Sequence, residues 1–153
     1  MGFLPNGILP TLAMTTHDGR QHSTLIRRLA LGFVFLWFAI GGVCHFLFLS
    51  AFVSVVPPSI PYPLAMVYIS GVLELLGAAG LIFRRTRRYA GWGLALLTIA
   101  VTPANVYMWQ HPERFPAVSE WLLLLRLPLQ AALILCILWS TQIIGRRTLN
   151  KRP

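Results

Sequence analysis

Four long apolar runs restrict what this chain of 153 residues can fold into. Each run is close to or above the roughly 18 residues that a helix needs to cross a bilayer, which favours membrane-spanning helices. The sequence therefore predicts an all-α fold, an integral membrane four-helix bundle formed by residues 25–145. The expected spans are approximately residues 29–49, 63–83, 90–108 and 122–144.

The composition also argues against a soluble globular domain. Hydrophobic residues make up 56% of the chain, charged residues only 11%, and the mean hydropathy is +0.68. Soluble chains carry about 25% charged residues. No cleavable signal peptide is expected, because the chain lacks an early basic region and a small-residue cleavage site after the first run.

The net charge of +9 is distributed unevenly along the chain. With four spans, three basic groups fall on one side of the membrane, and the opposite side has only Arg114. This is the positive-inside pattern, so both termini should be cytoplasmic. The expected location is the inner (plasma) membrane of a bacterium, and nucleic acid is not expected as a partner. The three groups are Arg20, Arg27 and Arg28; Arg84, Arg85, Arg87 and Arg88; and Arg146, Arg147, Lys151 and Arg152.

The segments outside the spans are predicted from their prolines and charges. Residues 1–24 are expected to form a mobile cytoplasmic lead, because Pro5 and Pro10 interrupt any amphipathic helix. Residues 146–153 form a basic cytoplasmic tail. The loop 50–62 is rich in proline, so no regular helix is expected there. It folds onto the bundle mouth as a lid or rests in the lipid headgroups, and both alternatives stay open.

One acid, Glu74, lies near the middle of the second span. Ionisable groups at such a depth are costly, rare and usually functional, so a partner has to pair with Glu74 or keep it protonated. Other spans supply His45, Asn105, Arg126 and Gln130. His45 has an alternative interpretation as a neutral histidine bonded to one neighbour, and Arg126 has one as a side chain that snorkels outward.

Depth indicates that these side chains can meet. At about 1.5 Å per residue, Glu74 lies about 16 Å below the outer face and Arg126 about 6–10 Å. His45 and Asn105 each lie about 6 Å below the outer face of a core about 30 Å thick. The sequence predicts a ligand-binding pocket in the outer half of the bundle. In it, Glu74 is ionised and bound by Arg126, with His45, Asn105 and Gln130 supplying further hydrogen bonds.

Two further features bear on the chemistry of this pocket. Pro103 removes a backbone donor and frees the carbonyl of Ile99, which at membrane depth has to face protein or water. Cys44 and Cys136 both lie within spans and form no CxxC motif, so neither a disulfide framework nor a metal site is expected. Both cysteines are interpreted as packing residues.

Four sequence patterns resemble the DoxX-like family of small membrane proteins. The resemblance covers about residues 27–140 and implies a four-helix membrane bundle. Some members of that family are subunits of quinone-linked oxidoreductases, others are membrane partners of redox proteins, and distant animal relatives assist receptor assembly. Glu74, Asn105, Arg126 and Gln130 match polar positions of the family pattern, with no catalytic assignment. The patterns are Gly42–Phe46, Ser70–Gly80, Pro103–Met108 and Leu125–Gln130.

Three functions remain open at this point. The first is a quinone- or lipid-binding component of membrane redox chemistry, with no covalent cofactor and a quinone or other lipid as ligand. The second is a non-catalytic assembly or accessory protein whose buried ion pair is structural. The third is a lipid-modifying enzyme that uses Glu74 and His45 as acid and base. The partners expected are the lipid bilayer, a quinone or isoprenoid ligand, and a redox or other membrane protein. Whether the chain catalyses a reaction is left open.

Overall fold

The computed structural model describes residues 11–142, with side chains described from Ser23 to Gln142. The first ten residues of the predicted lead and the predicted basic tail 146–153 lie outside the described residues. The described part contains helices and no strand, which confirms the all-α class. The elements are α1 Thr11–Leu47, α2 Leu49–Ser54, α3 Pro63–Ile82, α4 Arg87–Ala100, α5 Thr102–Gln110, the short 3-10 helix η1 Pro112–Arg114, and α6 Glu120–Ser140.

Four helical stretches in the described part are long and apolar enough to cross a membrane. The third of them joins α4 and α5 through a break at Val101. The break lies two residues before Pro103, whose ring cannot follow a continuous helix without a clash. The stretches are Ser23–Leu47, Pro63–Ile82, Arg87–Gln110 and Glu120–Ser140.

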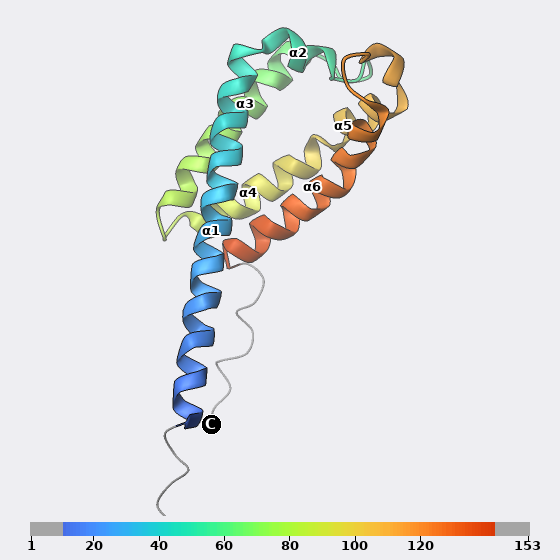
Figure 1. Ribbon diagram of the computed structural model, residues 1–153. Helices are drawn as coiled ribbons and strands as arrows, with labels where there is room; N and C mark the ends of the chain where they lie inside the picture. Colours follow the sequence, from blue (N-terminus) through green and yellow to red (C-terminus); the bar gives the residue numbers. More distant parts are fainter. Residues whose placement is uncertain (1–10, 143–153) are drawn as a thin grey trace, which may run out of the picture.

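The helices are arranged as two pairs that meet at one end and diverge toward the other (Figure 1). One pair is α1 with α3, and the other is α6 with the interrupted helix α4–α5. A buried core joins all four helices where the pairs meet. It consists of Val34 and Phe38 on α1, Ala78 and Leu81 on α3, Leu94 and Ala95 on α4, and Ile137 on α6.

The first pair is held closely together by two glycines that face each other. A Cβ on Gly42 of α1 would lie 3.1 Å from the carbonyl oxygen of Gly71, and one on Gly71 would lie 2.8 Å from the Cβ of His45. Since any side chain would force the helices apart, small residues at this crossing set the distance between α1 and α3.

Two segments are more helical than the sequence suggests. α1 begins at Thr11, within the segment 1–24 that was expected to be a mobile lead. The last proline of that segment is Pro10, so the residues after it all keep their backbone N–H groups. In the loop 50–62, the residues up to Ser54 belong to α2, because the first proline is Pro57. The expectation of no regular helix was therefore wrong for the first part of this loop.

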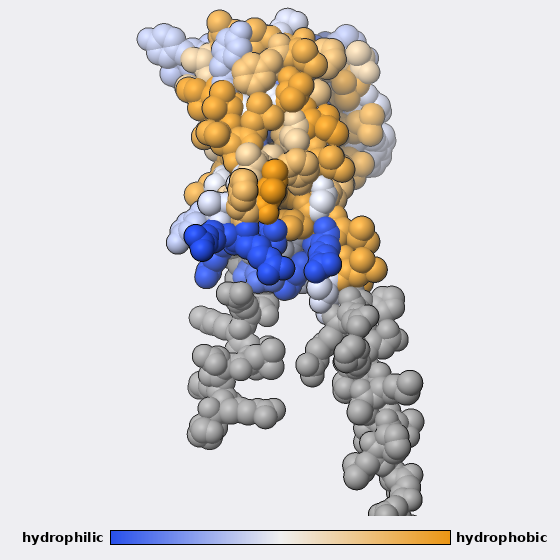
Figure 2. All heavy atoms as spheres, turned by 90° about the vertical axis from the view of Figure 1, so that its left-hand side faces the viewer, coloured by the Kyte–Doolittle hydropathy of each residue, from blue (hydrophilic) through white to orange (hydrophobic). Residues whose placement is uncertain are grey.

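Arginines gather at the end of the molecule where α3 ends and α4 begins. Figure 2 shows this end as a hydrophilic band below a hydrophobic belt. Arg87 caps the end of α3, because its Nε donates to the Leu81 carbonyl at 2.9 Å. The guanidinium of Arg27 lies 5.2 Å from the ring centroid of Trp139, which places α1 and α6 in the same region. The exposed arginines of the connection itself are Arg84, Arg85 and Arg88.

Candidate functional site

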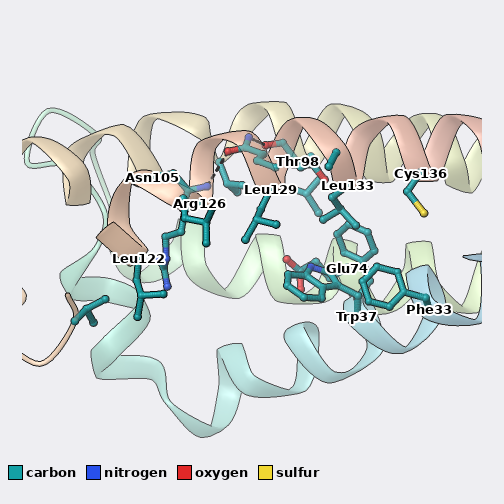
Figure 3. Close-up of a pocket in the computed structure, with 17 residues that line it drawn as sticks. Phe33, Trp37, Glu74, Thr98, Asn105, Leu122, Arg126, Leu129, Leu133 and Cys136 are labelled. Atoms are coloured by element: carbon teal, nitrogen blue, oxygen red, sulfur yellow. Dashed lines mark hydrogen bonds between the residues drawn. The ribbon is translucent and has the colours of Figure 1, made fainter. Parts of the chain in front are cut away.

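A cavity of about 750 Å³ lies between the two helix pairs (Figure 3). All four candidate spans contribute to its lining, which is mainly apolar. Its polar lining residues are Glu74, Thr98, Asn105, Arg126 and Gln130, and its apolar and thiol lining residues are Phe33, Trp37, Phe38, Leu97, Val101, Val118, Leu122, Leu125, Leu129, Ala132, Leu133 and Cys136.

Four of the five residues predicted to form a pocket line this cavity: Glu74, Asn105, Arg126 and Gln130. The fifth, His45, does not line it but lies beside Glu74. The structure therefore brings the predicted residues into one region, although Glu74 does not pair with Arg126 as the sequence suggested.

His45 is the basic side chain that lies next to Glu74. Its Nδ1 lies 3.7 Å from Oε2 of Glu74 and 2.9 Å from the carbonyl oxygen of Gly41. A carbonyl oxygen only accepts, so Nδ1 carries a proton in this hydrogen bond. The imidazole ring also stacks on Phe52 of α2, with 4.0 Å between ring centroids. The side chains of His45 and Glu74 are only 10% and 13% exposed, so each is largely enclosed by helices.

The predicted ion pair between Glu74 and Arg126 is wrong. Among the described side chains, the His45–Glu74 contact is the one acid–base approach within 4.0 Å. Arg126 instead donates from Nη1 to Sδ of Met108 at 2.8 Å. Glu74 and Arg126 lie on opposite walls of the cavity (Figure 3). Helix geometry adds an offset in depth, because Arg126 is about 9 Å from the start of α6 and Glu74 about 16 Å from the start of α3.

An amide network joins α6 to the break between α4 and α5. Nε2 of Gln130 donates to the carbonyl of Thr98 and, at 2.6 Å, to the hydroxyl of Thr102. Oε1 of Gln130 accepts from Nδ2 of Asn105 at 2.8 Å. The carbonyls of a last helical turn lack intrahelical partners, and Gln130 supplies one. This network explains why an interrupted helix is tolerated inside the bundle.

The network corrects the sequence analysis in one detail. The sequence pointed to the carbonyl of Ile99, whereas the carbonyl that receives a side-chain donor is that of Thr98. Thr98 and Thr102 were missed as site residues, although their spacing to Asn105 places all three on one helical face.

Aromatic side chains of α1 form the other part of the cavity that the sequence analysis missed. Phe33 and Trp37 line it, with 5.8 Å between their ring centroids. Their separation of four residues indicates a shared helical face. In an apolar span, however, spacing does not distinguish a face toward lipid from a face toward a cavity.

The donor set gives no support to a metal centre in the described part of the chain. No group of three His, Cys, Asp or Glu side chains there has the arrangement that a metal ion needs. Cys44 and Cys136 are both free thiols, and Cys136 lines the cavity near Phe33. Chemically, the cavity offers an apolar interior, a carboxyl group on one wall, and amide and guanidinium donors on the other.

These features define a small helical protein with four candidate membrane spans and a cavity between two helix pairs. Residues 34–142 match the family described as Domain of unknown function (DUF8561), so the chain belongs to that family. The match begins in α1 and runs through all the helices that line the cavity. No curated protein and no solved structure matches the chain.

Proposed function

We propose that this protein is an integral membrane protein that holds a quinone or another lipid in the cavity between its helix pairs. The observation that carries the proposal is the cavity itself: about 750 Å³, mainly apolar, with a few convergent polar side chains. Small-molecule sites in proteins have this character and this range of volumes. Because the cavity lies between apolar helices, a ligand that is dissolved in the bilayer is the natural occupant.

Membrane insertion is supported by the outward faces of the four helices. Leu76, Leu96 and Leu135 are 64%, 62% and 62% exposed, and many other large apolar side chains are exposed with them. Soluble monomers rarely expose contiguous apolar surface on this scale, whereas contact with lipid stabilises it. Exposed Trp109 and Trp121 fit one interfacial aromatic belt.

The orientation follows from the arginine band at the end where α3 meets α4. By the positive-inside rule, we propose that this end faces the cytoplasm and that both termini lie on that side. A bacterial inner membrane suits this arrangement. The resemblance to DoxX-like proteins adds the association with membrane redox chemistry, in which the protein binds a quinone and a partner protein carries the electrons.

Two other functions are each favoured by one observation. The amide network of Gln130 satisfies its own groups within the bundle, as expected if the protein is a structural assembly factor. The approach of His45 to Glu74 at the cavity wall fits an acid–base pair in a lipid-modifying enzyme. The lipid-binding function ranks first because neither observation by itself accounts for the cavity.

The experiment is to purify the protein in mild detergent and identify co-purifying lipids by mass spectrometry. Leu129 lines the cavity and is 55% exposed, so Leu129→Trp should fill the space and lower ligand recovery at least tenfold. Leu135, on the same helix and 62% exposed, does not line the cavity, so Leu135→Trp is the matched control.

Recovery of one lipid class with wild type and Leu135→Trp, but not with Leu129→Trp, supports the proposal. A quinone in that class supports the redox association, and an isoprenoid substrate supports the enzyme. The same mixture of lipids with all three proteins would contradict a specific cavity ligand and favour the assembly function.

A further inference from the structure

The side chain of Arg126 has a charge that no described neighbour balances. Arginine keeps its proton under all ordinary conditions, so its guanidinium is a permanent cation with five N–H donors. The structure gives it one hydrogen bond, from Nη1 to the thioether of Met108. A thioether is a weak, uncharged acceptor, and no described carboxylate lies within 4.0 Å of the guanidinium.

Glu74, the acid across the cavity, is not the missing partner. It lies on the wall formed by α1 and α3, close to Trp37, whereas Arg126 lies near Leu122 and Asn105 on the other wall (Figure 3). Its nearest basic group is His45. Arg126 is exposed and also lines the cavity, so its remaining donors can reach a group inside it.

The cationic lining residue Arg126 and the aromatic and thiol lining residues lie toward different ends of this cavity, and Glu74 lies beside Trp37 (Figure 3). Arg126 and Asn105 lie toward one end, while Phe33, Leu133 and Cys136 lie toward the other (Figure 3). Nδ2 of Asn105 is bonded to Gln130, but its side-chain oxygen and the other donors of Arg126 have no partner within the described part. A molecule with a polar head and an apolar chain fits this distribution.

We infer that the cavity binds a one-chain amphiphile with an anionic head group, a carboxylate or a phosphate monoester, held by Arg126. This inference rests on the proposed function, since it names the class of lipid in the same cavity. The head accepts hydrogen bonds from the guanidinium, which are about twice as strong as neutral ones. The chain lies along Leu129 toward Phe33 and Leu133. A cavity of about 750 Å³ has the volume of a site for one small ligand. This volume favours a lipid with one hydrocarbon chain over a lipid with two.

The test compares head groups on the full-length protein in nanodiscs of phosphatidylcholine. Three photo-probes carry a diazirine at the same carbon near the methyl end: hexadecyl phosphate, hexadecanoate and hexadecanol. Labelling yield is measured, and mass spectrometry locates the labelled residues. Both anionic probes should label the region of Phe33 and Leu133 about tenfold more than the alcohol, in keeping with a hydrogen bond to a charged group.

Charge variants assign this preference to one arginine. Arg126→Gln should reduce labelling by the anionic probes to the level of hexadecanol. Arg114→Gln is the matched control, because Arg114 bonds to Tyr107 and does not line the cavity. This variant removes the same charge from η1 and should leave the preference unchanged. The head-group comparison on wild type needs no variant, so poor folding of Arg126→Gln would not prevent the test.

The outcomes separate this inference from the function on which it rests. Equal labelling of the cavity by the alcohol and the anionic probes would overturn the anionic head group and leave lipid binding in place. Labelling confined to lipid-facing residues would overturn both. Displacement of the anionic probes by millimolar inorganic phosphate would show that the site takes a free anion, which overturns the amphiphile.

Discussion

The Glu74 carboxylate fills the space beside Gly41 of α1: its Oε2 lies 2.8 Å from the position that a Cβ on Gly41 would occupy. The same oxygen lies 3.7 Å from Nδ1 of His45, one turn further along α1. Gly41 therefore makes room for the acid, and His45 flanks it. This local arrangement, rather than an ion pair across the cavity, determines where the carboxyl group lies.

The glycines of α1 and α3 should differ in their tolerance of a methyl group. Gly71→Ala should lower the free energy of unfolding by about 1–3 kcal/mol, because the new Cβ meets the Cβ of His45 at 2.8 Å and nothing there moves easily. Gly41→Ala should have a smaller effect, because the atom it meets is the end of a flexible side chain. Unfolding in mixed micelles measures both.

Gly93→Ala is the control for this pair, since a Cβ there has nothing within 4 Å. In the interior of α4 it should be neutral or stabilising by up to about 1 kcal/mol. Equal effects of Gly71→Ala and Gly93→Ala on stability would contradict a close approach of α1 to α3 at Gly71.

A double-mutant cycle should find that Glu74 is coupled to His45 and not to Arg126. Glu74→Gln and His45→Ala should be non-additive by about 0.5–3 kcal/mol in unfolding free energy, as for side chains in contact. Glu74→Gln and Arg126→Met should add within about 0.5 kcal/mol, because the cavity separates them. A larger coupling to Arg126 than to His45 would mean that the two walls close on each other in solution.

Loss of the Gln130 side-chain amide should destabilise the junction of α4 and α5. Gln130→Leu leaves the Thr98 carbonyl and the Asn105 amide without their side-chain partner, at a cost of about 1–3 kcal/mol. Gln110→Leu, at the exposed end of α5, should change stability by less than about 0.5 kcal/mol. Hydrogen exchange at residues 98–105 should rise in the Gln130 variant alone.

The two thiols should be dispensable for folding and for ligand binding. Cys44→Ala, Cys136→Ala removes two free thiols that are only partly buried, so a small loss in stability is expected. Thermal unfolding and lipid recovery should both resemble those of wild type. Loss of the co-purified lipid from a folded double variant would instead give one of the thiols a role in binding.

Membrane topology should follow the arginines. Ser119 and Thr86 are both exposed, and they lie at opposite ends of the bundle. In the variant without Cys44 and Cys136, Ser119→Cys should react with an impermeant maleimide on intact cells. Thr86→Cys should react only after permeabilisation, because its end of the bundle carries the arginines. A Thr86→Cys protein that reacts on intact cells would reverse the orientation.

Several features of the protein follow from the amino-acid sequence alone. The number and approximate position of the candidate spans depend on length and hydropathy, which act within each helix. The location of Glu74, Asn105, Arg126 and Gln130 around one cavity was also predictable, because depth along a helix follows from a constant rise per residue.

The partners of those residues were decided only by the tertiary structure. Whether Glu74 meets Arg126 or His45 depends on how far apart two helices lie and on how each helix is rotated about its axis. The sequence pattern does not fix that rotation, because several faces of an apolar helix have similar hydropathy. Contacts between Gly42 and Gly71 bring α1 and α3 together, while the core around Leu81 and Ile137 joins the two pairs at one end only. The divergence beyond that core opens the cavity and separates the acid from the arginine.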